Sequence, residues 1–268
     1  MKSVVITGSS KGIGLGLAKE FLKAGCSVAL SSFEKEDLEA VYNTLAKEYG
    51  DDKVAQYKCD VTKIDEVEGL WKEAKDKFGT VDIWINNAGV TNAFLDLWEV
   101  DPAEVSTIVN TNLVGTFYGV RVAMHGMMEQ GSGAIYNFYG FGAGDERKPA
   151  GLTTYGTTKR AIRYMTECLI EETKESPIQV GSLMPGTVIT DFLYKVLRST
   201  PKEGRDEMVR GFNMFGDTVE TVTEFLAKEV LANTEHGAEI SWMTPEKAQA
   251  RMKDPFYQKR DLFSTLDL

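Results

Sequence analysis

The sequence contains little cysteine and little histidine, and this excludes several kinds of site. Cys26, Cys59 and Cys168 follow no CxxC spacing, so free thiols are expected rather than disulfides or a zinc site. Among 268 residues only His125 and His236 are histidines. We therefore expect no metal site and no histidine-based catalytic triad.

Long apolar runs and an excess of positive charge are also missing. No run approaches the roughly 18 apolar residues of a membrane span, so we expect no integral membrane segment. The N-terminal MKSVVITG enters an apolar run after two residues, leaving no room for a secretory signal, and predicts a cytoplasmic protein. A net charge of −10 argues against a nucleic-acid partner, because phosphate contacts need a basic surface.

What the sequence does contain is an alternation of short β-branched runs with longer segments of helical period. This pattern predicts an α/β protein with a doubly wound Rossmann fold: a seven-stranded parallel sheet with helices on both faces, in one domain over residues 1–268. The predicted strands are Val4–Thr7, Ser27–Ser32, Val54–Lys58, Asp82–Asn86, Ala134–Phe138, Ile178–Leu183 and Glu239–Trp242. The predicted helices are Leu15–Lys23, Asp37–Glu48, Glu66–Phe78, Glu104–Glu129 and Thr157–Lys174.

One connection interrupts this alternation. Between Pro185 and about Asp217 the chain carries aromatic and methionine side chains but no strand pattern. This length is atypical for a connection, so we expect a substrate lid at about 187–217. A polar C-terminal tail at about 245–268, with aromatic residues interspersed, is expected to cover either the substrate cleft or a neighbouring subunit.

A glycine cluster follows the first predicted strand. In TGSSKGIG, Gly8, Gly12 and Gly14 precede a helical segment. Glycines allow a tight turn and a close approach to a pyrophosphate, and the helix N-terminus offers free N–H groups and a positive dipole end. The position after strand one of an α/β chain therefore predicts a dinucleotide site.

Tyr155 and Lys159 lie four residues apart at the start of a predicted helix, so both side chains share one face. A tyrosine has an ordinary pKa near 10, and a nearby ammonium group favours the phenolate and lowers that pKa. The pair suits general acid catalysis, in which Tyr155 protonates the oxygen formed when hydride reaches a carbonyl carbon.

In their order along the chain, TGSSKGIG, NNAG at Asn86–Gly89 and the Tyr155/Lys159 pair resemble the short-chain dehydrogenases/reductases. The resemblance implies that Asp60 contacts the adenine, that Thr190 binds the nicotinamide carboxamide, and that Asn112 supports a proton-relay water. Asn110, nearby, is expected to be a surface or packing residue. The family usually forms dimers or tetramers, which implies a homo-oligomer. The cofactor-binding residues implied are Thr7, Gly8, Ser10, Lys11, Gly12, Ile13, Gly14, Ser32, Phe33, Asp60, Val61, Asn87, Ala88, Gly89, Tyr155, Lys159, Pro185, Gly186, Val188 and Thr190.

The residues after strand two bear on the choice of dinucleotide. An acidic residue there favours NAD, and a basic environment accommodates the 2′-phosphate of NADP. This chain has Ser32 and Phe33 at that point, with Lys11 before the second glycine. NADP(H) is therefore favoured over NAD(H).

The family's catalytic serine after strand five is absent, because YNFYGFGAG places Tyr139 and Gly140 there. Either a backbone N–H near Gly140–Gly142, the Tyr139 hydroxyl or water replaces the serine, or the protein binds cofactor without efficient chemistry. Loss of one donor to an oxyanion costs about 2.7–4 kcal/mol, which slows a reaction without abolishing it.

Several further stretches resemble the chlorophyll b reductase branch of the family: NFYGFGAG, YGTTKRAIRYMT, PGTVITDFL, FNMFGDTVETV and ISWMTP. The resemblance implies NADPH-dependent reduction of a small-molecule carbonyl substrate, with the C7-formyl group of chlorophyll b as the leading candidate and 7-hydroxymethyl chlorophyll a as its product. Two alternatives stay open: a generic carbonyl or alcohol oxidoreductase acting on a smaller metabolite, and a noncatalytic NADP-binding regulator.

Overall fold

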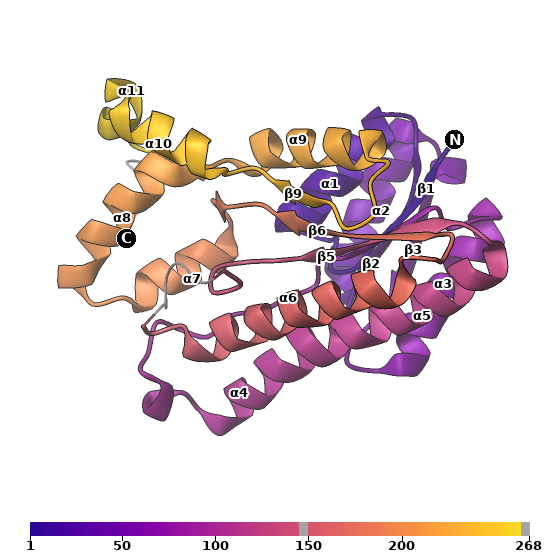
Figure 1. Ribbon diagram of the computed structural model, residues 1–268, viewed down its shortest axis with the longest axis horizontal. Helices are drawn as coiled ribbons and strands as arrows, with labels where there is room; N and C mark the ends of the chain where they lie inside the picture. Colours follow the sequence, from indigo (N-terminus) through magenta and orange to yellow (C-terminus); the bar gives the residue numbers. More distant parts are fainter. Residues whose placement is uncertain (145–149, 264–268) are drawn as a thin grey trace.

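The structure is a computed structural model that describes residues 1–144 and 150–263. Its centre is a seven-stranded sheet in the order β3-β2-β1-β4-β5-β6-β9, with every neighbouring pair parallel (Figure 1). The strands are β1 (Ser3–Ile6), β2 (Ser27–Ser32), β3 (Val54–Lys58), β4 (Ile83–Asn86), β5 (Gly133–Phe138), β6 (Ile178–Met184) and β9 (Glu239–Ser241). The predicted sheet and all seven predicted strands are confirmed, with ends that coincide or differ by one residue.

Helices cover both faces of this sheet. Those that flank it are α1 (Gly12–Lys23), α2 (Lys35–Tyr49), α3 (Ile64–Phe78), α5 (Gly115–Gln130), α6 (Thr153–Thr173) and α9 (Val219–Ala232). In Figure 1, α1, α2 and α9 lie above the sheet, and α3, α5 and α6 lie below it. Two short 3₁₀ turns, Asp51–Lys53 and Leu97–Glu99, lie in connections.

Strand β1 is largely apolar because both of its faces are buried. In β1 the side chains alternate: Val4 and Ile6 pack into one apolar cluster, which includes residues of α1, α2 and α9, and Val5 packs into a second, which includes residues of α3 and α5. A strand between two helical layers needs no polar face, so its sequence reads as a continuous β-branched run.

The helix predicted over Glu104–Glu129 is corrected by the structure. There α4 (Pro102–Ile108) passes into a π-helix (Val109–Val114), which continues as α5. Apolar periodicity does not show a single widened turn, and π-turns occur frequently at functional sites. This one contains Asn112.

The region 185–217 is also corrected, since it does contain strand. Thr187–Val188 (β7) pairs in parallel with Gly216–Asp217 (β8), and α7 (Asp191–Ser199) and α8 (Lys202–Phe215) lie between them. Strands of two residues are too short to show alternation. We call residues 187–217 the α7–α8 segment.

The expected C-terminal tail is largely helical, with α10 (Pro245–Lys253) and α11 (Pro255–Lys259) packed against α8 at one end of the molecule (Figure 1). Residues 264–268 of that tail lie outside the described residues. Among the helices that the structure describes, none is long and apolar enough to cross a membrane.

Candidate active site

A cavity of about 2260 Å³ lies at the carboxyl ends of the parallel strands. Its wall includes residues that directly follow β1, β3, β4 and β6. Ligands of open α/β sheets bind at this edge, where the strand order reverses on either side of β1. Typical ligand pockets measure about 300–1,000 Å³, so this cavity is large enough for two ligands at once.

The turn from β1 into α1 forms one part of the cavity wall. Gly8 and Gly12 have positive φ angles of 65° and 56°, a conformation that side chains rarely adopt. A Cβ atom at Gly14 would lie 2.6 Å from Nδ2 of Asn87, so the turn also requires glycine there for space. The backbone thus lies uncovered next to the N-terminus of α1, as a bound pyrophosphate requires.

Thr7 and Asn87 join this turn to the segment after β4. The hydroxyl of Thr7 accepts hydrogen bonds from the backbone N–H groups of Asn87 and Ala88, both at 3.0 Å. In return, Nδ2 of Asn87 donates to the carbonyls of Thr7 and Gly8, both at 2.9 Å. The NNAG sequence therefore fixes the glycine turn.

Asp60 follows β3 and borders the cavity. Its Oδ1 accepts hydrogen bonds from the backbone N–H and the hydroxyl of Thr62, at 3.0 and 2.8 Å. Partial burial opposes the charged form, but these hydrogen bonds and nearby Lys63 hold the pKa of Asp60 below its ordinary value. A stable carboxylate therefore stands at this point of the wall.

Ser10 and Ser32 lie side by side at the end of β2. Their hydroxyl groups are 3.0 Å apart, and Ser32 also accepts a hydrogen bond from the backbone N–H of Glu34. Lys11 and Phe33 border the cavity here. So does Glu34, whose acidic side chain the sequence analysis did not consider.

The residues that sequence patterns predicted for cofactor binding all border this cavity, with one exception. The exception is Thr7, which is buried, does not border the cavity, and contacts the lining residue Asn87 through hydrogen bonds. The residues of that set that line the cavity are Gly8, Ser10, Lys11, Gly12, Ile13, Gly14, Ser32, Phe33, Asp60, Val61, Asn87, Ala88, Gly89, Tyr155, Lys159, Pro185, Gly186, Val188 and Thr190.

Tyr155 and Lys159 lie on the first turns of α6 and border the same cavity. Nζ of Lys159 lies 5.7 Å from the centre of the Tyr155 ring and donates a hydrogen bond of 3.1 Å to the carbonyl of Phe138. The ring of Phe192, from α7, meets the Tyr155 ring edge-on with their centres 5.2 Å apart. Both side chains of the pair are buried.

Burial sets the protonation of this pair. It raises the pKa of Tyr155 above its ordinary value, whereas the sequence predicted a lowered pKa, and it lowers the pKa of Lys159 to about 8. At neutral pH Tyr155 is therefore a protonated phenol and Lys159 is mainly an ammonium ion. A proton donor thus lies next to a cation that stabilises the anion left behind.

Asn112 lies behind the cavity wall. Its Nδ2 donates to the carbonyl of Val90 at 2.9 Å and to the hydroxyl of Thr158 at 3.2 Å, and its Oδ1 accepts from the N–H of Val90 at 2.8 Å. The side chain thus ties the segment after β4 to α6, between Tyr155 and Lys159. Asn110 is exposed, as expected for a surface residue, and it also borders the cavity.

Gly140 occupies the position where the serine was expected. A Cβ atom built there would overlap the hydroxyl oxygen of Tyr155 and would lie 3.4 Å from Cε of Lys159. The Tyr139 hydroxyl is a poor replacement for the serine, because Tyr139 is buried, which raises its pKa, and its hydroxyl lies near Ser182 and Thr166, which lower that pKa. Of the donors considered from the sequence, a backbone N–H or water remains.

Comparison with known proteins assigns this architecture to a family. The family model described as short chain dehydrogenase matches residues 2–200. The chain belongs to this family. It is therefore an oxidoreductase with a Rossmann fold that uses NAD(P)H, and the uncovered glycine turn, the Asp60 carboxylate and the Tyr155/Lys159 pair fit such a dinucleotide.

Two relatives are chloroplast proteins of Oryza sativa subsp. japonica. A probable chlorophyll(ide) b reductase is 33% identical over 92% of this chain and 50% of its own length. A second chlorophyll(ide) b reductase is 35% identical over 86% of this chain and 66% of its own. The chain thus spans about half the length of the first of these relatives.

Solved structures of family members have the same fold. A 3-ketoacyl-(acyl-carrier-protein) reductase from Brucella melitensis, complexed with NADH, is 28% identical with a TM-score of 0.77, over 92% of this chain and 98% of its own. An alcohol dehydrogenase from Thermococcus sibiricus, complexed with 5-hydroxy-NADP, is 25% identical with a TM-score of 0.74. The match covers 91% of this chain and 99% of that chain. Both forms of the dinucleotide therefore occur on this fold.

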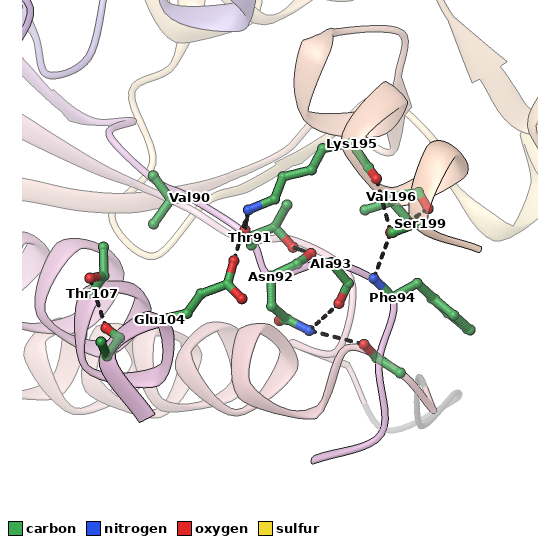
Figure 2. Close-up of polar contacts among 12 residues, drawn as sticks. Val90, Thr91, Asn92, Ala93, Phe94, Glu104, Thr107, Lys195, Val196 and Ser199 are labelled. Atoms are coloured by element: carbon green, nitrogen blue, oxygen red, sulfur yellow. Dashed lines mark hydrogen bonds and ion pairs between the residues drawn. The ribbon is translucent and has the colours of Figure 1, made fainter. Parts of the chain in front are cut away.

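Beyond the family motifs, α7 is held against the segment that follows β4 (Figure 2). Nζ of Lys195 donates to the carbonyl of Thr91 at 2.7 Å and pairs with Glu104 of α4 at 2.9 Å. The hydroxyl of Ser199 accepts a hydrogen bond of 2.7 Å from the N–H of Phe94. These contacts bring α7, and with it Phe192, over the catalytic pair.

Sequence patterns missed several residues of the cavity wall. Phe94 borders it from the segment after NNAG, Ala248 borders it from α10, and Thr244 borders it from the N-cap position of that helix. The only signal for Phe94 was its place shortly after a known motif. For α10 the sequence indicated only that the tail would cover either the substrate cleft or a neighbouring subunit, because the residues in contact depend on how distant helices pack.

Proposed function

We propose that the protein reduces an aldehyde or ketone with NADPH, with the C7-formyl group of chlorophyll b as the leading candidate substrate. The observation that carries the proposal is the pair of Tyr155 and Lys159, buried at one cavity that also has room for a large second ligand. The names of the two rice relatives support the choice of chlorophyll b.

In this proposal bound NADPH supplies the hydride, which adds to the carbonyl carbon. Tyr155 gives its phenolic proton to the carbonyl oxygen, so that a formyl group becomes a hydroxymethyl group. Lys159 stabilises the resulting phenolate by its charge, and solvent restores the proton to Tyr155. Asn112 has a positioning role, since its side chain binds Val90 and Thr158.

Preference for NADPH over NADH is part of the proposal. Lys11 and the hydroxyls of Ser10 and Ser32 are the groups that suit a 2′-phosphate, and position 32 carries no carboxylate to repel it. Glu34 also borders the cavity, and its carboxylate would disfavour a 2′-phosphate. The balance between these groups is tested directly by the Ser32 variant described below.

The α7–α8 segment is proposed to be a substrate lid. Its residues at the cavity include Phe192, Phe212, Met214 and Phe215, and Phe141, from the segment after β5, also borders the cavity. Flat, polarisable groups of this kind suit a large apolar ring system, and methionine adapts to irregular shapes.

The test is to incubate the purified protein with NADPH and chlorophyll b and to separate the pigments by chromatography. We expect 7-hydroxymethyl chlorophyll a to form, and Tyr155→Phe to reduce its rate by about 10²–10⁴-fold with NADPH binding retained. A panel of smaller aldehydes and ketones in parallel separates a chlorophyll reductase from a general carbonyl reductase. NADPH binding with no turnover on any substrate would instead indicate a noncatalytic regulator.

We also propose that the protein acts as a homo-oligomer in the cytoplasm. Phe117 and Met128, on one face of α5, and Tyr164 on α6 are 48%, 51% and 70% exposed. Large exposed apolar side chains on adjacent helices suit a subunit contact. Light scattering of the purified protein would give the oligomeric state, and a monomer at micromolar concentration would contradict this assignment.

A further inference from the structure

The C-terminal helices meet the α7–α8 segment at one buried carboxylate. Oδ2 of Asp217 accepts hydrogen bonds from Nη2 of Arg251 and Nε1 of Trp242, both at 2.7 Å, and its Oδ1 pairs with Nη1 of Arg260 at 3.2 Å. The side chains of Asp217, Arg251 and Arg260 are 9%, 4% and 13% exposed. The Tyr257 ring lies against both guanidinium groups, 4.4 and 4.8 Å from their Cζ atoms.

Arg260 also holds the backbone at this point. Its Nε donates to the carbonyl of Asn213 at 2.8 Å, and its Nη2 donates to the carbonyl of Gly216. The two arginines therefore fix the chain where α8 ends and β8 begins. A buried ionic cluster is a costly way to attach two helices, because apolar side chains would do so without desolvating charges. Because its hydrogen bonds are directional, such a cluster holds α10 and α11 in a single position relative to α8 and β8.

Asp217 connects this cluster to the cavity. Its strand β8 pairs with β7, and its carbonyl accepts a hydrogen bond of 3.0 Å from the N–H of Ile189. Val188 and Thr190, on either side of Ile189, both border the cavity. The path from Arg251 to the cavity wall therefore runs through one carboxylate and one backbone pairing.

The two ends of the α7–α8 segment are held differently. Near α7, Lys195 and Glu104 are 49% and 30% exposed, and exposed ion pairs contribute little to stability. Near β8 the charges are buried, and removing one partner leaves the others without compensation. The segment is thus held firmly at Asp217 and weakly at Lys195.

We propose that Arg251, assisted by Arg260, is a positioning residue for the oxidoreductase reaction. Arg251 holds Asp217 in place, and Asp217 in turn fixes the position of β7 through the pairing of β7 with β8. Val188 and Thr190 are thereby placed to contact the nicotinamide end of the cofactor. Neither arginine borders the cavity, so they act through Asp217. This inference rests on the proposed function for the identity of the reaction, whereas its effect on cofactor binding is independent of any substrate.

The test compares Arg251→Met, which removes the charge, with Arg251→Lys, which keeps it. Leu70→Ala is the matched control, because Leu70 is fully buried in the apolar cluster of α3 and α5 on the other side of the sheet. Three quantities are measured on the full chain: the NADPH dissociation constant from NADPH fluorescence, amide hydrogen exchange of residues 187–190, and kcat and KM for carbonyl reduction.

We expect Arg251→Met to raise the NADPH dissociation constant at least fivefold, to speed exchange at residues 187–190 and to lower kcat at least tenfold. Arg251→Lys should recover most of each loss, and Leu70→Ala should lower the melting temperature while leaving the dissociation constant within twofold. Unchanged NADPH binding and exchange in Arg251→Met would overturn the proposal, as would an equal effect in Leu70→Ala.

The same set of measurements also tests the proposal if the protein reduces no carbonyl or if Arg251→Met does not fold. If the unmodified protein reduces no carbonyl, the proposed function fails, and NADPH binding and exchange still test the positioning role. If Arg251→Met does not fold, Asp217→Asn replaces it, because the amide keeps the shape of the carboxylate but not its charge. Normal NADPH binding and exchange in Asp217→Asn would then overturn the proposal.

Discussion

The hydroxyl oxygen of Tyr155 lies in the space that a side chain at residue 140 would need. A Cβ atom built on Gly140 would come closer to this oxygen than real Cβ atoms approach any neighbour. A side chain at residue 140 would therefore require the Tyr155 hydroxyl to move.

Restoring the family's serine should harm the enzyme. We expect Gly140→Ser to lower kcat at least tenfold, because Tyr155 must move away from its place beside Lys159. The matched control is Gly211→Ser, since Gly211 also borders the cavity but a Cβ atom there would meet no atom within 4 Å. Steady-state kinetics on both variants check this, and a gain of activity in Gly140→Ser would refute the steric argument.

The buried Lys159 should make the protein less stable at neutral pH than at pH 9.5. In the folded state its pKa is about 8, against an ordinary value of 10.5. Between these values the unfolded chain binds more protons, so this group's contribution to stability rises with pH. The difference between the two pKa values corresponds to about 3 kcal/mol in the free energy of unfolding.

Lys159→Met isolates this contribution, because the buried thiols and the other buried tyrosines are shared by both proteins and neighbouring Tyr155, whose pKa burial raises, stays protonated over this pH range. We expect the variant to be more stable than the parent at pH 7 by about 1–3 kcal/mol, after loss of the hydrogen bond to Phe138 is allowed for. The advantage should shrink towards pH 9.5. Urea unfolding at both pH values measures it, and a constant difference would contradict the assigned burial effect.

A carboxylate at position 32 should reverse the cofactor preference. We expect the parent protein to bind NADPH more tightly than NADH, and Ser32→Asp to weaken NADPH binding at least tenfold with little change for NADH. Ser106→Asp is the control, because it adds the same charge to the cavity wall from α4. Fluorescence titration with both dinucleotides decides the matter, and tighter binding of NADH by the parent would reverse the assignment.

The Lys195–Glu104 pair should behave as a weak contact of the surface. A double-mutant cycle with Lys195→Met and Glu104→Gln is expected to give a coupling free energy of about 0.2–1 kcal/mol. In 1 M salt this coupling should largely disappear, because the Debye length falls to about 3 Å. Urea unfolding at low and high salt measures both values. Coupling that persists in high salt would show that the pair is shielded from solvent.

Much of the fold could be predicted because strands buried on both faces have a distinctive composition. Val4–Ile6 and Ser27–Ser32 read as strands without reference to the rest of the chain. The glycine turn and the Tyr155/Lys159 pair could be found because their chemistry depends on short, fixed spacings. The site was therefore predictable wherever its residues are neighbours in sequence.

The remaining features depend on contacts between distant residues. The π-turn around Asn112 involves one widened turn inside a helical pattern, and the pairing of β7 with β8 involves two residues on each side. The partners of Asp217 come from positions 242, 251 and 260, at spacings that no local rule relates. Only the packing of α8 against α10 and α11 brings them together.

The anchoring of Asp217 also has a consequence for biosynthesis. A ribosome makes the α7–α8 segment before it makes Arg251 and Arg260, so for a time the carboxylate of Asp217 has neither arginine as a partner. β9, the edge strand of the sheet, likewise follows Asp217 in the chain. A nascent chain can thus assemble most of its sheet and its glycine turn well before β7 and β8 reach their final positions. Under the proposed positioning role, the cofactor site is completed only after Arg251 and Arg260 have left the ribosome and reached Asp217.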